Sequence, residues 1–149
     1  MQIRNLKLRN FRNYSHLDID FAERFNIIYG NNAQGKTNII EAIFLCASGR
    51  SHRTSRDDEL VKYDSGGFEV NLQLRKKEFD DEIGIIFNSV KVGSEKRKKI
   101  SINEIPLKRI GDLMGHLNAV IFSPEDLLVI KQGPAERRRF IDITLSQLR

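Results

Sequence analysis

The sequence has 149 residues, of which 40% are hydrophobic and 30% charged, with a formal net charge of +5. This length and apolar content suit one globular domain with a core and exclude a disordered tail. The longest apolar run, from Ile39 to Ala47, is broken by Glu41 and falls well short of the ~20 residues that span a bilayer, so we expect no membrane contact.

The excess of positive charge favours polyanionic partners, nucleic acid first among them, although many proteins are mildly basic without such a role. The segment Met1–Arg4 lacks the apolar stretch of a secretion signal. Cys46 is the only cysteine, which rules out an internal disulfide. These observations together predict a cytoplasmic protein.

The first 30 residues predict three strands. Ile3–Leu8 reads as the first, and alternating apolar residues at Leu17, Ile19 and Phe21 indicate a half-buried second strand. Phe25–Tyr29 is a short apolar run with β-prone residues, which predicts a buried third strand.

A helix is predicted from Lys36 to Ala47, because apolar residues recur there at helical spacing. From about Phe68 the period returns to two, which predicts an antiparallel meander of three strands joined by polar loops. The alternating residues of this meander are Phe68, Val70, Leu72 and Leu74, then Ile83, Ile85 and Phe87, then Ile100 and Ile102.

Beyond the meander, Pro106–Met114 predicts a short helix and Ala119–Phe122 a buried strand. Ser123 is a good helix cap with Pro124 in the first turn, and a further helix begins near Pro134. This last helix has no stop signal, so we expect a single amino-terminal unit, residues 1–149, of a longer protein.

One motif carries specific chemistry. The pattern G-x-x-x-x-G-K-[ST] of a phosphate-binding P-loop lies between the expected third strand and the expected helix, which is the context that the motif requires. Its residues are Gly30, Asn31, Asn32, Ala33, Gln34, Gly35, Lys36 and Thr37.

Each residue type in the motif suits a nucleoside triphosphate. Gly30 and Gly35 let the backbone turn its N–H groups toward the phosphates, and the helix adds the positive end of its dipole. The Lys36 ammonium can reach the β- and γ-phosphates, and the Thr37 hydroxyl can bind Mg²⁺. The sequence therefore predicts ATP and Mg²⁺ as cofactors.

Hydrolysis needs a carboxylate at the end of an apolar strand. Glu125 and Asp126 follow the apolar segment Ala119–Phe122, but capping of the next helix explains them. We do not assign them as this carboxylate. Without it we expect no catalytic residue in the chain, nucleotide binding that is weak or absent, and negligible turnover.

Three sequence blocks together resemble the RecF family of SMC-like ABC ATPases. They are IRNLKLRNFRNYSHLDIDF with NIIYGNNAQGKTNIIEAI, GRSHRTSRDDELV, and VIFSPEDLLVIKQGPAERRRFID. SMC proteins typically carry Gly-Ser where this chain has Ala33-Gln34, which favours RecF within the group.

The resemblance implies a mixed α/β fold, the first lobe of an ABC-type ATPase head, in which a P-loop core carries an antiparallel β-meander and carboxy-terminal helices. The helical lobe would begin at about residues 124–149. The parent protein would be a weak ATPase that binds DNA junctions and dimerises with ATP. It would act with RecR, RecO and RecA in DNA repair, replication, recombination and SOS induction.

The same resemblance makes Arg53 a candidate nucleotide contact, because it fits the S-x-R pattern of the family. The alternative for Arg53 is an ion pair with Asp57, Asp58 or Glu59 on a solvated loop.

Candidate DNA contacts are basic residues in two places: Lys96, Arg97, Lys98 and Lys99, and Arg137. A solvated hairpin tip, or a charged edge that deters strand pairing, explains the first four slightly better. Arg137 lies in a run of arginines that could instead pair within its helix.

Two further functions stay open from the sequence. A small P-loop kinase or transferase would need an arginine-bearing lid, whereas a meander follows the P-loop helix here. A module that only binds DNA or a protein partner would need no nucleotide.

Overall fold

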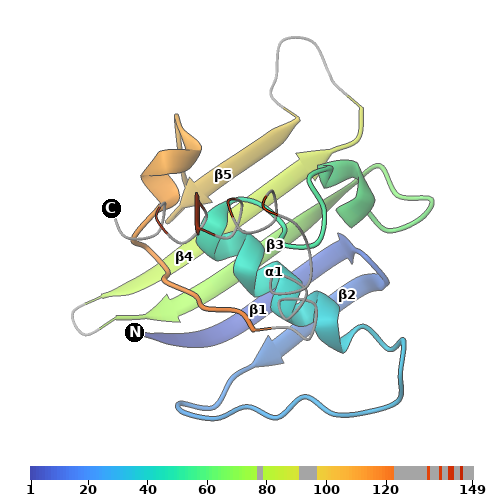
Figure 1. Cartoon of the computed structure of the whole chain (residues 1–149), viewed down its shortest axis with the longest axis horizontal. Coiled ribbons are helices and arrows are strands. Elements are labelled where there is room, and N and C mark those ends of the chain that lie inside the picture. Colours follow the sequence, from blue (N-terminus) through green and yellow to red (C-terminus); the bar gives the residue numbers. More distant parts are fainter. Residues whose placement is uncertain are drawn as a thin grey trace.

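The computed structural model describes residues 1–76, 79–90 and 97–122, together with Pro134, Arg138, Ile141, Asp142 and Leu145. In these ranges a six-stranded antiparallel sheet in the order β2-β1-β3-β4-β5-β6 lies against one long helix (Figure 1). The strands are β1 (Gln2–Phe11), β2 (Tyr14–Asp20), β3 (Gly67–Arg75), β4 (Asp80–Asn88), β5 (Lys98–Ile102) and β6 (Ile105–Pro106). The helix is α1 (Lys36–Ser48), and two short 3-10 helices are η1 (Asp57–Leu60) and η2 (Ile110–Leu113).

The core lies between α1 and the face of the sheet that α1 crosses. Every second residue of β3 and β4 is buried, including Leu72 and Ile85 at 0% exposure. Leu45 of α1 belongs to the same buried cluster. Each such aliphatic side chain contributes about 1.5–3 kcal/mol when fully buried. The alternation seen in the sequence is therefore the alternation of the sheet's two faces, and the predicted meander is confirmed.

The amino-terminal hairpin extends this meander. β1 pairs with β2 on one side and with β3 on the other, so Leu8 faces both Leu17 and Val70. A two-residue turn at Arg12 and Asn13 closes the hairpin, with Arg12 in the left-handed region at φ 54°. The sequence predicts both strands of the hairpin, but it does not predict that β1 lies in the interior of the sheet.

Two predicted buried strands are wrong. Phe25–Tyr29 is neither strand nor buried, and its side chains Phe25, Ile27 and Tyr29 are 87%, 86% and 89% exposed. Ala119–Phe122 is likewise irregular, with Val120 99% exposed. A strand requires ladder partners for its backbone, and no described strand pairs with either segment. Apolar content alone did not predict whether such a partner exists.

Other expectations are partly met. α1 matches the predicted helix almost residue for residue, whereas the helix expected at Pro106–Met114 is only the 3-10 turn η2. Most of residues 124–149 lie outside the described ranges, and the five positions described there are helical and exposed. None of the helices in the described ranges has the length and apolar character needed to cross a bilayer.

The start of β3 gives a test of the sheet register. A Cβ on Gly67 would lie 2.1 Å from the carbonyl oxygen of Phe87 on β4, whereas a Cβ on Gly66 meets nothing within 4 Å. We expect Gly67→Ala to lower the free energy of unfolding by about 1–3 kcal/mol, because β3 and β4 must move apart. Gly66→Ala is the matched control and should change it by no more than about 0.5 kcal/mol. Urea denaturation measures both, and equal effects would contradict the register.

Candidate nucleotide-binding site

The P-loop motif connects the irregular segment 21–29 to α1, which begins at Lys36 as predicted. Ala33 (φ 64°) and Gly35 (φ 93°) have left-handed backbone conformations, and Asn31–Gln34 is exposed. Successive changes of backbone hand turn N–H groups toward one side of a loop, which is the geometry that binds anions. The helix side of the predicted context is thus present, and the strand side is not.

The β1–β2 turn packs directly on this loop. A Cβ on Gly35 would lie 2.5 Å from Oδ1 of Asn13, so any other residue here would have to displace the Asn13 side chain and would also be strained by its φ of 93°. The same Asn13 oxygen accepts a hydrogen bond from Nδ2 of Asn38 at 2.9 Å. The Tyr14 hydroxyl lies 3.4 Å from the carbonyl oxygen of Gln34, to which it donates. The hairpin therefore supports the loop and the first turn of α1 from one side.

Lys36 lies folded along the loop. Its Nζ donates to the carbonyl oxygens of Gly30 at 2.8 Å and Asn31 at 2.6 Å. An ammonium group has three donors. One donor is therefore left for a phosphate oxygen while the other two hold the side chain beside the loop.

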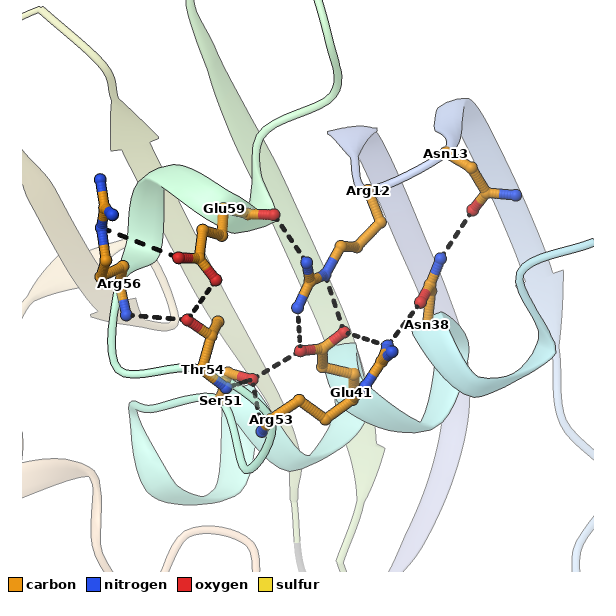
Figure 2. Close-up of polar contacts among 9 residues, drawn as sticks. All are labelled: Arg12, Asn13, Asn38, Glu41, Ser51, Arg53, Thr54, Arg56 and Glu59. Carbon is orange, nitrogen blue, oxygen red and sulfur yellow. Dashed lines mark hydrogen bonds and ion pairs between the residues drawn. The ribbon is translucent and has the colours of Figure 1, made fainter. Parts of the chain in front are cut away.

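One turn further along α1, Glu41 is fully buried and carries a carboxylate (Figure 2). Arg12, from the β1–β2 turn, binds it through two nitrogens: Nε lies 2.9 Å from Oε2 and Nη2 lies 2.7 Å from Oε1. The remaining Nη1 of Arg12 donates to the carbonyl oxygen of Glu59 at 2.8 Å. This paired geometry satisfies the charge that the fold has taken out of water.

The loop after α1 completes the surroundings of Glu41. The Ser51 hydroxyl donates to Oε1 of Glu41 at 2.5 Å and accepts the backbone N–H of Arg53 at 3.0 Å. The Arg53 side chain runs back along α1, as Figure 2 shows, and its Nη1 lies 3.2 Å from Oε2 of Glu41. The same Nη1 donates to Oδ1 of Asn38 at 3.1 Å. Arg53 is thus brought to the first turn of the P-loop helix.

The alternative set of partners for Arg53 is wrong. The sequence left open a pair with Asp57, Asp58 or Glu59, but among the described residues Arg53 pairs with Glu41. The η1 acids instead bind other cations: Asp57 binds Lys98, Asp58 binds Arg97, and Glu59 binds Arg56.

These ion pairs also show where two of the candidate DNA contacts in the basic run 96–99 lie. Lys98 is largely buried, with Nζ 2.7 Å from Asp57 and 2.8 Å from the carbonyl oxygen of Gly49. Arg97 binds Asp58, and its guanidinium lies 4.9 Å from the Phe87 ring centroid. Neither residue is a solvated hairpin tip, and both hold the sheet to η1. Lys99 also has a partner, while the candidates Lys96 and Arg137 lie outside the described residues.

The sequence did not reveal the roles of Glu41, Arg12 and Ser51. In the sequence, Glu41 stands out only as a break in an apolar run. That break was the available signal, because a carboxylate on the buried face of a helix requires a cation or hydrogen-bond donors around it.

Burial by itself would raise the pKa of Glu41, but the hydrogen bonds from Arg12 and Ser51 outweigh it and hold this pKa below the ordinary 4.5. The folded state therefore binds this proton less readily than the unfolded chain. The resulting stability is fully present above pH 4.5 and is lost as the pH falls through the lowered pKa.

We expect Glu41→Gln to lower the free energy of unfolding by about 3 kcal/mol at pH 7, because two arginines lose their charged partner. The difference from the unsubstituted chain should shrink as the pH falls below 4.5. Denaturant titrations at pH values from about 3 to 7, which span the range in which carboxylates titrate, measure this difference in the free energy of unfolding. The exposed Asp80→Asn is the control and should cost no more than about 0.5 kcal/mol. A difference for Glu41→Gln that does not vary with pH would contradict the charged pair.

Comparisons with known proteins identify the family of the chain. The family model described as AAA domain matches residues 5–141. The DNA replication and repair protein RecF of Acetivibrio thermocellus is 61% identical over 149 residues, which is all of this chain and 39% of that protein. The chain thus spans about two fifths of the length of the curated relatives it matches.

Solved structures give the same result. The recombination mediator protein RecF-ATP in the RecFOR pathway superposes with a TM-score of 0.90 at 39% identity, over 99% of this chain and 39% of that one. A structure from work on ATP-driven dimerisation and DNA-stimulated activation of SMC ATPases has a TM-score of 0.73 at 23% identity, over 97% and 99% of the two chains, and supports the fold alone. The expected α/β head-domain fold and the resemblance to RecF proteins are both confirmed, and the chain belongs to the AAA domain family.

Proposed function

We propose that this chain binds the phosphates of ATP, with Mg²⁺, as the nucleotide-binding part of a protein of DNA repair and replication. The observation that carries the proposal is a P-loop that opens α1 with Lys36 already folded beside it. The relatives named DNA replication and repair protein and the solved RecF-ATP structure support the same nucleotide and the same process.

The residues of the loop have different roles in binding the phosphates and Mg²⁺. The backbone N–H groups of Gly30–Thr37 and the positive end of α1 surround the phosphates. Lys36 supplies a charge with one unused donor. The Thr37 hydroxyl lies on the first turn and offers Mg²⁺ one oxygen ligand, with phosphate oxygens and water as the others. Arg53 adds a second cation from the loop after α1.

The finer role follows the RecF relatives. ATP would bring two copies of the whole protein together on DNA, with slow hydrolysis as the release step. RecR would be the direct partner, with RecO and RecA in the same process, SOS induction as one outcome and the cytoplasm as the location. The membership of residues 1–149 in one nucleotide-binding unit is part of this proposal.

Affinity of the chain by itself should be low. The segment before the P-loop, Phe25–Tyr29, has exposed side chains and no strand partner among the described residues. Among the described residues the loop is therefore supported by α1 and the β1–β2 turn, with no strand beside it. A loop that is ordered by its ligand spends part of the binding energy on that ordering.

The chain as a purely DNA-binding module is less favoured. Arg97 and Lys98 neutralise Asp58 and Asp57 within the fold, so they add little unpaired charge for a phosphate backbone.

We expect ATP with Mg²⁺, titrated to millimolar concentration, to shift the backbone amide NMR signals of Gly30, Gly35 and Lys36. Lys36→Ala should weaken this binding at least about tenfold, because the phosphates lose their nearest cation. Lys7→Ala is the matched control. It removes the same charge from the opposite face of the sheet, where Lys7 pairs with Asp18, and should leave the dissociation constant unchanged.

Shifts confined to residues away from the loop, or equal binding by both lysine variants, would contradict the proposal. Turnover by the same samples should be negligible, and hydrolysis that disappears in Lys36→Ala would contradict the expectation of an incomplete catalytic site.

A further inference from the structure

Glu41 has a place in the structure that a simple buried ion pair does not require. It lies on α1 next to the P-loop, and its one carboxylate binds groups from two other segments: Arg12 of the β1–β2 turn, and Ser51 and Arg53 of the loop after α1. The two arginines it binds are not held alike.

Arg12 is held through all three of its guanidinium nitrogens. Its Nε and Nη2 bind Glu41, its Nη1 binds the carbonyl oxygen of Glu59, and its side chain is only 20% exposed. All three nitrogens thus have acceptors in the fold. Because each guanidinium nitrogen is held by an acceptor in the fold, Arg12 is turned toward Glu41 and Glu59, and its role is to fix the Glu41 carboxylate in place.

Arg53 is held by one nitrogen. Nη1 donates to Glu41 and Asn38, while no hydrogen bond from Nε or Nη2 is found to any of the described residues. The side chain is 38% exposed. The Nε–Nη2 edge of a guanidinium is a planar two-donor fork that matches two oxygens of a phosphate. Holding Nη1 fixes the plane of this fork and leaves the fork itself available.

A short chain of contacts joins this arrangement to the P-loop. Asn38 accepts from Arg53 and donates to Asn13 at 2.9 Å, and Asn13 fills the space beside Gly35. Figure 2 shows the Arg53 guanidinium between Glu41 and Asn38, toward the side of Asn13. The position of the Arg53 guanidinium is therefore linked to the P-loop through Asn38, in the first turn of α1.

We propose that Glu41 is a positioning residue for the phosphate site: its buried carboxylate, fixed by Arg12, holds Nη1 of Arg53 so that the Nε–Nη2 edge is presented to the phosphates of the nucleotide. The proposal rests on the nucleotide-binding function proposed above. It differs from a stabilising role, because Glu41 then affects phosphate binding only through Arg53.

A double-mutant cycle separates the two roles. The variants are Glu41→Gln, Arg53→Gln and the double variant. Each is titrated with ATP and Mg²⁺ at about pH 7, and the same NMR signals are followed. We expect each single variant to weaken binding about fivefold to tenfold. The double variant should be no weaker than Arg53→Gln alone, because Glu41 has nothing left to position.

Asp81→Asn is the matched control. Asp81 is also a buried carboxylate, 4% exposed, with Nζ of Lys76 at 2.5 Å and Nδ2 of Asn103 at 3.1 Å. Its loss should lower the melting temperature as the loss of Glu41 does, yet leave the dissociation constant for ATP unchanged. If Glu41→Gln does not fold, Ser51→Ala takes its place, since Ser51 bonds both Glu41 and the backbone of Arg53. We expect Ser51→Ala to weaken ATP binding about threefold, and not at all when Arg53 is already Gln.

The outcomes are distinct. Multiplying effects in the double variant, or equal weakening by Asp81→Asn, would overturn the positioning role and leave the nucleotide site standing. Binding by Glu41→Gln equal to that of the unsubstituted chain would do the same. Absence of ATP binding by the unsubstituted chain would overturn the proposed function and this inference with it.

Discussion

The buried carboxylate of Glu41 is the constraint on which the rest of the site depends. A charge without solvent requires a full set of donors, and here they come from three segments: the β1–β2 turn through Arg12, α1 itself, and the following loop through Ser51 and Arg53. Satisfying one carboxylate therefore fixes the relative positions of the β1–β2 turn, α1 and the loop after α1. Hydrophobic burial packs α1 against the sheet, and the polar cluster around Glu41 fixes the position of α1 relative to the β1–β2 turn and the following loop.

The sheet carries this arrangement because β1 lies inside it. Pairing of β1 with both β2 and β3 places the turn at Arg12 and Asn13 beside the P-loop. At the other side of the meander, ion pairs likewise connect the sheet to a neighbouring segment, since Lys98 and Arg97 bind the acids of η1. Basic residues that suggest DNA binding in the sequence are in part structural cations of the fold. Positive charge in a sequence becomes evidence for a polyanion site only once its internal acids have been found.

Sequence reasoning succeeded where the signal was local. Periodicity predicted the meander and α1, and the spacing of Gly30, Gly35 and Lys36 predicted a loop that leads directly into α1, as the structure has it. It failed where the outcome depended on a distant partner. Phe25–Tyr29 has the composition of a buried strand, yet no described strand pairs with it. The partner of Arg53 was sought among acids near it in sequence, whereas Glu41 lies 12 positions earlier, on the face of a helix that apolar residues otherwise occupy.

The two proposals together make the P-loop and Arg53 one phosphate site whose geometry Glu41 fixes before the nucleotide binds. A crystal structure of the chain with ATP and Mg²⁺ tests it most directly. The account predicts the triphosphate against the backbone N–H groups of Gly30–Thr37, with Lys36 and the Nε–Nη2 edge of Arg53 turned to its oxygens and Nη1 of Arg53 still bound to Glu41. A triphosphate bound in the loop with Arg53 turned away from it, or with the Arg53–Glu41 contact broken, would contradict the account.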